Sequence, residues 1–290
     1  ANDNIGIGYY TLTANTTGAN NVGVGVSALH SNTTASGNTA IGAFCLDTNT
    51  TGASNVAVGF YAMKANTTAS NNAALGYSAL RYNTTGASNV AVGYYALRAN
   101  TTASNNVAVG YDALTANTTG QQQVSVGAIS LDANTTGNYN TALGYATLSG
   151  NTTGDNNTAV GLSALYSNTT ADNNTAIGKE TLLLNTTGTQ NTAVGALALD
   201  ANTTASNNTA LGYAALSANT TGTGNVAVGV QALENNTGNY NTAVGLQALD
   251  TCTTGANNTA VGFYAAYNLT TGTKNTALGQ SALEGCTDGT

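Results

Sequence analysis

The sequence predicts an all-β fold, a parallel β-roll or β-solenoid built from seventeen-residue rungs with two short strands in each. Three observations predict it. Asn recurs at every seventeenth position, from Asn15 through Asn32 and Asn49 towards the end of the chain. One Gly and one aliphatic residue keep the same places in every copy. Only 6% of the residues are charged, against about 25% in ordinary domains, and 41% are apolar, which is enough to fill a regular core.

The repeat defines a numbering that applies along the whole chain. We number the seventeen places of a rung as slots 0 to 16, starting at the Asn of the NTTG turn, so that residues 151–167 run from slot 0 to slot 16. The sequence predicts one continuous array over residues 1–290, with a partial rung at 1–14, sixteen rungs at 15–285 and a partial rung at 286–290. Because the chain enters and leaves within a rung, we expect it to be a segment of a longer fibre.

One rung departs from the fixed length. The rung that begins at Asn219 is one residue short, and the pattern recovers at once. A deletion that leaves the pattern intact is typical of a loop. We therefore expect the missing residue to lie between Glu234 and Asn235.

Slots 6 to 10, which read NTAVG in residues 157–161, are predicted to form the first strand of the rung. Slot 7 is mostly β-branched and slot 9 is always Ile, Val or Leu, residues that the β conformation favours. Slot 10 is Gly in all seventeen copies, from Gly8 to Gly279. Such uniformity indicates a positive φ or a neighbour too close for a Cβ atom.

Slots 11 to 15, which read YYALR in residues 94–98, are predicted to form the second strand. Slot 14 is Leu except at Met63 and Ala266, so slots 9 and 14 are expected to form the core. A helix is the alternative for this segment. It would have at most six residues between the Gly and the next NTTG turn, and a helix shorter than about 12 residues is marginal.

Slots 8 and 13 hold small residues, mostly Ala, with Gly23 and Ser125 among the exceptions. Neighbours along a strand point to opposite faces, so slots 8 and 9 face opposite ways, and both are restricted to apolar or small residues. The simplest explanation is a strand that is packed on both faces. We expect the aliphatic side to face the core and the alanine-lined side to be hidden against sister subunits, which makes the chain a homo-oligomer.

The NTTG or NTTA segment at slots 0 to 3 is predicted to form a turn, because Asn and Gly tolerate left-handed backbone and Thr hydroxyls bond to the local backbone. Its Asn-Thr-Thr triplets are also acceptor sequences for N-glycosylation, a use that the sequence leaves open. Slot 6 is Asn in sixteen copies, with Gln123 as the exception. Amides that stack at one height step predict a hydrogen-bonded ladder along the axis.

Composition argues against several functions. The net charge of −7 disfavours nucleic-acid binding, which needs clustered Lys and Arg. No apolar run approaches the length of about 18 residues that a membrane span requires, so no membrane insertion is expected. The single histidine, His30, has no carboxylate pair or cysteine cluster beside it in the sequence, so we expect no enzyme activity, no cofactor and no metal. Because Cys252 and Cys286 lie two rungs apart, they and Cys45 are expected to be free thiols, with an interchain bridge as the alternative.

Two rows of residues are candidates for a surface contact. Lys64, Arg81 and Arg98 occupy slot 15 of three consecutive rungs and form a basic row beside Asp47. This row is interpreted as a solvated edge or as a contact for acidic glycans. Slot 11 carries an aromatic ladder, interpreted as interface packing or as a platform on which carbohydrate stacks. The ladder consists of Phe60, Tyr77, Tyr94 and Tyr111.

Several runs in the repeat resemble those of a known family. NVAVG at 55–59 and 89–93, NTAIG at 38–42 and 174–178, and the SAL or YAL that follows resemble the head repeats of trimeric autotransporter adhesins. The longer form, NTAVG followed by AL and NTTG, is similar to repeats of bacteriophage tail fibres and bacterial surface fibres. The resemblance implies a left-handed parallel β-roll, assembled as a parallel homotrimer, with a structural and adhesive role outside the cell or on a virion. The rung here is longer than the typical adhesin head repeat, which enlarges the turn.

The sequence therefore predicts a structural or adhesive segment of an extracellular fibre, a stiff stalk or head that projects or presents binding surfaces. Its expected partners are copies of itself and host-surface glycans or proteins. An ice-binding or carbohydrate-binding β-solenoid is the alternative. Residues of the Thr16 and Thr17 type lie in a turn rather than outward on a flat strand, which favours the fibre over an ice-binding surface. A repeat-built enzyme would require clustered acids in one rung, and no rung contains them.

Overall fold

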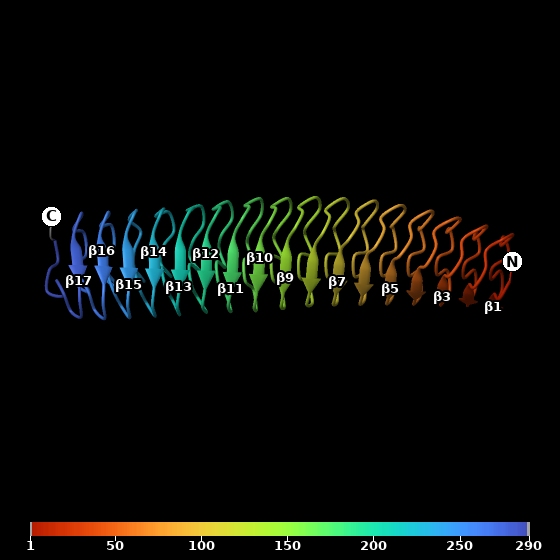
Figure 1. The fold of residues 1–290 in the computed structure, drawn as a ribbon, viewed down its shortest axis with the longest axis horizontal. Helices are drawn as coiled ribbons and strands as arrows, with labels where there is room; N and C mark the ends of the chain where they lie inside the picture. The colour runs from red at the N-terminus through yellow and green to blue at the C-terminus, as the bar shows by residue number, and fades with distance from the viewer. Residues whose placement is uncertain (1, 289–290) are drawn as a thin grey trace. The chain divides into compact units, whose positions relative to one another are not determined.

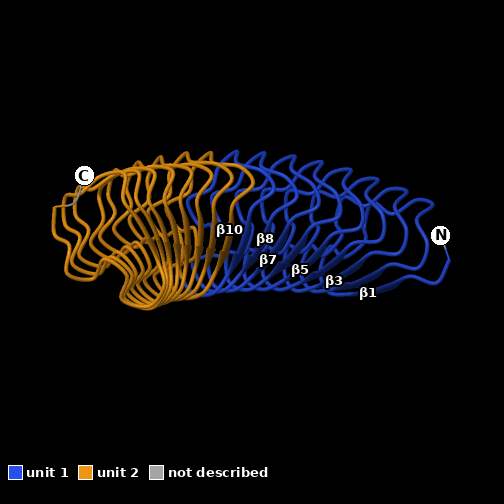
Figure 2. Cartoon of the chain, turned by 60° about the vertical axis from the view of Figure 1, so that its left-hand side comes forward, with its two compact units in different colours: residues 1–145 blue, residues 146–290 orange. Residues whose placement is uncertain are grey.

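A computed structural model describes residues 2–288 of the chain. The chain divides into two compact units, Ala1–Tyr145 (unit 1) and Ala146–Thr290 (unit 2), and each unit repeats the same rung (Figure 2). Each rung contains one strand of three residues at slots 7 to 9, and the strands of successive rungs within a unit pair in parallel (Figure 1). The all-β parallel solenoid predicted from the sequence is confirmed, and the described residues contain no helix that could cross a membrane.

The strands are uniform in length and position. Those of unit 1 are β1 Ile5–Ile7, β2 Val22–Val24, β3 Thr39–Ile41, β4 Val56–Val58, β5 Ala73–Leu75, β6 Val90–Val92, β7 Val107–Val109, β8 Val124–Val126 and β9 Thr141–Leu143. Those of unit 2 are β10 Thr158–Val160, β11 Thr175–Ile177, β12 Thr192–Val194, β13 Thr209–Leu211, β14 Val226–Val228, β15 Thr242–Val244, β16 Thr259–Val261 and β17 Thr276–Leu278.

The register of the strands reproduces the period of the sequence. In unit 1 Thr39 pairs with Val56, and in unit 2 Thr158 pairs with Thr175, so each slot lies against the same slot of the next rung. Parallel strands lie about 4.8 Å apart, so residues of one slot form a row with that spacing. Every side-chain type is thereby repeated along a row, on the inside or on the outside of the solenoid.

The second strand predicted at slots 11 to 15 is wrong, because this segment is a turn. Slots 12 and 14 have a positive φ in every described rung, for example 60° at Tyr61 and 50° at Met63, whereas a strand requires a negative φ. The amides of the turn nevertheless bond to neighbouring rungs in alternate directions. Tyr61 N donates to Ala43 O of the preceding rung, and Met63 N donates to Ala79 O of the following rung. The backbone of this segment is therefore hydrogen-bonded to both neighbouring rungs although it is not extended.

The core is only partly the predicted one. Leu97 at slot 14 is fully buried, as are Ala91 at slot 8 and Ala96 at slot 13. Slot 9 points outward instead, and Leu75 there is 51% exposed. The interior is narrow, since a Cβ atom placed on Gly23 at slot 8 would lie 3.5 Å from Ala28 O. Only the smallest side chains fit between slot 8 and the turn, and the branched aliphatic residues are excluded from it.

This inversion removes one argument for assembly. The alanines of slots 8 and 13 were expected to be hidden against sister subunits, but they are buried within their own chain, and that prediction is wrong. In a three-residue strand, the flanking slots 7 and 9 face the side opposite to slot 8. The β-branched and aliphatic residues of slots 7 and 9 therefore form the outer face of the sheet.

The invariant Gly of slot 10 meets both predicted demands. Gly42 has a φ of 128°, a conformation that side-chain-bearing residues rarely adopt. A Cβ atom on Gly42 would also lie 2.7 Å from the carbonyl oxygen of Gly59, the same slot in the next rung. Any other residue at slot 10 would collide with the backbone of the next rung, except at Gly279, where an added Cβ atom meets nothing within 4 Å.

Two rows of buried amides run beside the alanine core. At slot 6, Asn38 Nδ2 donates to Gly52 O at 2.9 Å, and Asn21 Oδ1 accepts from Asn38 N at 3.0 Å, so the predicted ladder is present. At slot 0, Asn49 Nδ2 donates to Asn32 Oδ1 at 3.0 Å and also to Gly52 O at 2.9 Å. The second ladder was predicted only as part of a turn. It joins amide to amide, which satisfies groups that would be costly to bury unpaired.

The deletion lies in the turn rather than at the predicted junction. Asn236, not Asn235, occupies the buried place of slot 0, since its amide nitrogen donates to Leu233 O at 3.1 Å, as Asn32 N does to Leu29 O at 3.2 Å. Thr237 follows as slot 1 and Gly238 as slot 3, so the missing residue is slot 2. Slot 2 is exposed and makes few bonds, which explains why its loss leaves the register intact.

The three cysteines are free thiols, as predicted. Cys45 occupies slot 13 and its Sγ donates to Gly59 O at 2.6 Å. Burial raises the pKa of the Cys45 thiol to about 11, and that of Cys252 to about 11. Both side chains therefore stay protonated and act as small apolar core residues.

Candidate functional site

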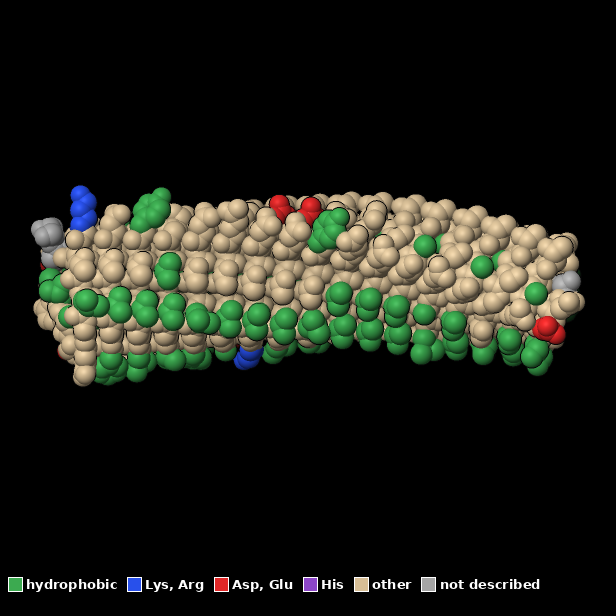
Figure 3. Space-filling view, viewed as in Figure 1, with side chains coloured by type: hydrophobic (Ala, Val, Ile, Leu, Met, Phe, Trp, Pro, Cys, Tyr) green, Lys and Arg blue, Asp and Glu red, His purple; other side chains and the backbone are tan. Residues whose placement is uncertain are grey.

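The outer face of the sheet carries an aliphatic row at slot 9 in both units, beside a slot-7 row that is mostly Val in unit 1 and mostly Thr in unit 2. We define the strand face as the side chains of slots 7 and 9. Its members include Val56 (46% exposed) in unit 1 and Leu211 (46% exposed) in unit 2. Figure 3 shows hydrophobic side chains gathered in rows along this side of the molecule. Contiguous exposed apolar surface is typical of an interaction site rather than of an ordinary monomer surface.

The slot-11 rings form a stack in unit 1. Ring centroids are 5.6 Å apart for Phe60 and Tyr77, 5.1 Å for Tyr77 and Tyr94, and 5.7 Å for Tyr94 and Tyr111, with interplanar angles of 11–13°. Such offset parallel pairs contribute about 0.5–1.5 kcal/mol each beyond their buried area. Hydrogen bonding with Tyr95 raises the pKa of Tyr94 to about 12, so the Tyr94 hydroxyl is neutral at physiological pH.

The basic row of slot 15 lies on a second set of aromatic rings, and the cations and these rings alternate along the row. The Arg81 Cζ atom is 4.4 Å from the Tyr61 ring centroid and 5.1 Å from that of Tyr82. The Arg98 Cζ atom is 5.5 Å from the Tyr82 centroid and 4.4 Å from that of Tyr95. We name this set the cation–aromatic row. It consists of Phe44, Lys64, Tyr61, Arg81, Tyr82, Arg98 and Tyr95.

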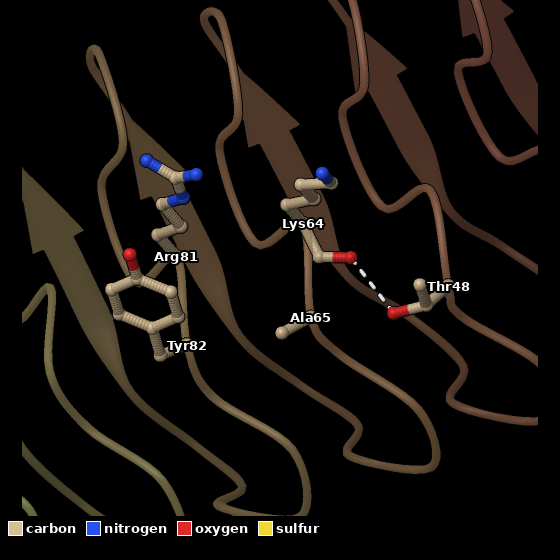
Figure 4. Close-up of a pocket in the computed structure, with 5 residues that line it drawn as sticks. All are labelled: Thr48, Lys64, Ala65, Arg81 and Tyr82. Carbon is tan, nitrogen blue, oxygen red and sulfur yellow. Dashed lines mark hydrogen bonds between the residues drawn. The ribbon is translucent and has the colours of Figure 1, made fainter.

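Beside this row the surface is hollowed. The hollow has a volume of about 210 Å³ and is lined by Thr48, Lys64, Ala65, Arg81 and Tyr82 (Figure 4). Thr48, Ala65 and Tyr82 occupy slot 16 of three consecutive rungs, and the small Ala65 between the two larger side chains leaves the space. The Thr48 hydroxyl donates to Lys64 O at 2.8 Å and fixes the far wall.

The three cations of the row are not neutralised by the protein. Among residues 2–288 the ion pair is Lys179 with Glu180, so no carboxylate pairs with Lys64, Arg81 or Arg98. Arg98 Nε is buried and has no hydrogen-bond partner. The cations of the row are therefore held by contact with aromatic rings rather than by ion pairs, at about 0.5–1 kcal/mol for each exposed pair.

The sequence predicted the aromatic ladder and the basic row, but it did not predict the aromatic rings that lie against the basic row. Phe60, Tyr77, Tyr94 and Tyr111 stack as one ladder, and Lys64, Arg81 and Arg98 line up as one row. The rings beneath the cations were not predicted. In a strand, slots 12 and 15 would face opposite ways, which separates Tyr61 from Lys64. The left-handed residues at slots 12 and 14 bring them to one side, and no pattern of polarity signals such residues.

In unit 2, acidic residues occupy slot 15, the slot that holds the basic row in unit 1. Asp250 is 5% exposed, and burial and then the charge of Glu234 raise its pKa to about 6. Burial raises the pKa of Asp200 as well. Within residues 2–288 no group of three or more His, Cys, Asp or Glu side chains could hold a metal ion. His30, half-buried in slot 15, accepts from or donates to Thr13 Oγ1 at 2.7 Å through Nδ1.

The Asn of the NTT triplet is not available for glycosylation in a folded rung. Asn32, Asn100 and Asn202 are fully buried, and their amide nitrogens donate to neighbouring amide and backbone oxygens. A sugar attached to this nitrogen would replace those bonds and would not fit inside the solenoid. The triplets are therefore structural in this fold.

Comparisons with protein-family models, with curated proteins and with solved structures found no match to this chain.

Proposed function

We propose that the chain is a structural or adhesive segment of an extracellular fibre, at a cell surface or on a virion, that assembles with copies of itself through the strand face. The observation that carries the proposal is the exposed aliphatic row of slot 9, which both units present. Every copy repeats this row with the same spacing, so parallel copies would match each other at every rung. The role is non-enzymatic and requires no cofactor.

The assembly proposed here differs from the one expected from the sequence. Val92 of slot 9 and Val90 of slot 7 would be covered by the sister subunit, while the alanines stay inside each chain. Burying aliphatic surface stabilises association by about 25 cal/mol per Å² before the costs of association are subtracted. Left-handed winding and a trimer, which the resemblance to adhesin heads implies, belong to this proposal.

The mass of the chain in solution tests the proposal. Light scattering of the full chain is expected to give a multiple of 28.7 kDa. The double variant Val109→Asp/Val126→Asp places two charges on the strand face and is expected to reduce the mass to that of one chain. Thr102→Asp/Thr119→Asp places the same charges in the turns of the same rungs and should leave the mass unchanged. A monomeric wild-type chain would overturn the proposal.

A second function is favoured by one observation in unit 2. Thr occupies slot 7 in seven of its eight strands, from Thr158 to Thr276, and it lies outward on parallel strands beside the aliphatic row. The Thr residues that favoured a fibre over an ice-binding surface, those of the Thr16 and Thr17 type, lie in the turns, whereas the slot-7 Thr residues lie on strands. A flat row of Thr at about 4.8 Å spacing is a regular surface on which water can order. Thermal hysteresis of the chain, lost in Thr192→Lys/Thr209→Lys, would establish this role in place of assembly.

A further inference from the structure

We propose that the hollow at Lys64, Arg81 and Tyr82 is a binding site for an acidic sugar, one that carries a carboxylate or sulfate group. The site uses none of the residues of slots 7 and 9, so it does not rest on assembly through the strand face. It adds a ligand to a chain for which the proposed function names only copies of itself, and it decides between the two interpretations of the basic row, a solvated edge or a contact for acidic glycans.

The charge of the site selects an anion. Lys64 and Arg81 flank the hollow, and neither forms an ion pair with a carboxylate in the described part of the chain. Arg81 presents a planar guanidinium, whose paired N–H groups match the two oxygens of a carboxylate or sulfate. Since Tyr61 and Tyr82 hold this guanidinium from its sides, it is oriented before a ligand arrives. Less side-chain entropy is then lost on binding.

The size and lining of the site suit a single sugar ring. A volume of about 210 Å³ is below the 300–1,000 Å³ of pockets for drug-sized ligands. The hollow is lined almost entirely by apolar atoms, which give it an apolar floor. The charged ends of Lys64 and Arg81 lie together on the side away from Ala65 (Figure 4). The C–H face of a sugar ring can lie on such a floor while its acid group reaches Arg81.

The same geometry disfavours a nucleic acid. Sequence-independent binding of single strands depends on bases that stack on open aromatic faces. Both Arg81 and Arg98 lie over the Tyr82 ring, so a base would have to displace one of them. The basic row also ends after three rungs, because slot 15 is Asp47 before it and Thr115 after it. A short row matches one or two acidic sugars better than a long polyanion.

Calorimetric titration of the full chain tests the site. The probes are an oligogalacturonate, a sulfated galactan oligosaccharide, the unsulfated galactan, inorganic sulfate and a single-stranded oligonucleotide. We expect at least one of the two acidic oligosaccharides to bind and the neutral one not to bind. Arg81→Gln should raise the dissociation constant of the acidic oligosaccharide about tenfold or more, which corresponds to the loss of one charge-assisted bond pair. Lys274→Gln, which removes the same charge from unit 2, should have no effect.

A second variant separates the hollow from its charges. Ala65→Leu fills the space and keeps both cations, and slot 16 accepts Leu elsewhere, at Leu184. It should abolish binding of the acidic oligosaccharide. Equal binding to wild type and Ala65→Leu, equal loss in Arg81→Gln and Lys274→Gln, or equal affinity for inorganic sulfate or the oligonucleotide would overturn the proposal. Light scattering of the same samples reports assembly independently, so failure of one proposal is distinguishable from failure of the other.

Discussion

Units 1 and 2 have the same interior and different exteriors. At slot 7, unit 1 carries Val in five of nine strands, whereas unit 2 carries Thr in seven of eight. At slot 15, unit 1 carries three cations, Lys64, Arg81 and Arg98, and two acids, whereas unit 2 carries four acids and no Lys or Arg. Unit 1 as a whole has three Lys and Arg against four Asp and Glu, and unit 2 has two against eight. The stacked ring ladder belongs to unit 1.

The difference separates what sets the fold from what is free to vary. Slots 8 and 13 are small, slot 14 is mostly Leu and slot 10 is Gly in both units, and the amide ladder of slot 0 has the same geometry at Asn66 and at Asn185. These groups face inward and contact the same slots of the next rung. Outward side chains contact other outward side chains of their own and neighbouring rungs, as Arg81 contacts Tyr61 and Tyr82, so each stretch of rungs can acquire its own chemistry without disturbing the core. Substitutions at matched slots test this separation.

The largest effect is expected at slot 10. Gly42→Ala in unit 1 and Gly178→Ala in unit 2 should each lower the free energy of unfolding by about 3 kcal/mol or more, because both glycines have a strained φ and overpacking of backbone adds to the cost. The added Cβ would lie 2.7 Å from Gly59 O in the first case and 2.7 Å from Gly195 C in the second. Urea unfolding followed by circular dichroism measures the loss.

Gly285→Ala is the matched control for this prediction. A Cβ atom on Gly285 meets nothing within 4 Å, so the variant should unfold at the wild-type urea concentration. Losses that differ by more than about 1 kcal/mol between Gly42→Ala and Gly178→Ala would contradict the view that the two interiors are equivalent.

A smaller loss is expected in the amide ladder of slot 0. Asn100 Nδ2 donates to Asn83 Oδ1 at 2.8 Å, and Asn202 Nδ2 donates to Asn185 Oδ1 at 2.7 Å. Asn100→Ala and Asn202→Ala should each cost about 2 kcal/mol, because buried amide groups on both sides lose a partner. Hydrogen exchange of the adjacent backbone amides reports the loss rung by rung.

The end of unit 2 supplies the control for the ladder. Slot 0 there is Cys252, between Asn236 and Leu269, and its Sγ donates only a long bond to Gly255 O at 3.8 Å, while Asn236 Nδ2 donates to Gly238 O. Cys252→Ala should cost about 1 kcal/mol, the value for one lost methylene-sized group. If Cys252→Ala were as costly as Asn100→Ala, packing rather than hydrogen bonding would account for the ladder's contribution.

The features of the fold that depend on the seventeen-residue period could be predicted from the sequence. Those that depend on the sign of the φ angle, or on which face of the strand is inside, could not. Rung length, the slot-10 Gly, the slot-6 ladder and the stacked rings follow from residues that recur at one height step. Orientation does not follow, because alternation along a strand gives two faces without saying which is inside. Ala40 and Ile41 were assigned to the wrong sides for this reason, although the space beside slot 8 is narrow and holds only Ala, Gly or Ser. Leu and Tyr with a positive φ, as at Leu97 and Tyr95, give no signal in composition.

A pH dependence is expected of unit 2. The folded chain holds the pKa of Asp250 at about 6, above its ordinary value of 3.8, because burial and Glu234 disfavour the charged form. The folded state therefore binds this proton more tightly than the unfolded state, and its stabilising contribution is lost as the pH rises from about 4 through 6. The thermal midpoint of the wild type should fall over this range, and Asp250→Asn should flatten the decline.

The matched variant for this pH profile is Asp47→Asn, which removes a half-exposed carboxylate from the same slot of unit 1 and controls for the change in net charge. Asp250→Asn should also be more stable than the wild type at pH 8, since it no longer buries a carboxylate beside Glu234. A profile for Asp250→Asn that coincides with that of the wild type would show that this carboxylate contributes nothing to the pH dependence.

The smallest effect is expected where the exteriors differ most. Val107→Thr in unit 1 and Thr209→Val in unit 2 exchange the slot-7 residues of the two units, and each should change the free energy of unfolding by about 0.5 kcal/mol or less, because both residues favour strands and neither lies in the core. Urea midpoints measured below the concentration at which the chain associates would show this. A loss of more than about 2 kcal/mol at Val107, which is the size that core substitutions reach, would mean that slot 7 is buried within a single chain. A small loss combined with weaker self-association would place Val107 at the contact between copies, where the same exchange at Thr209 should strengthen association.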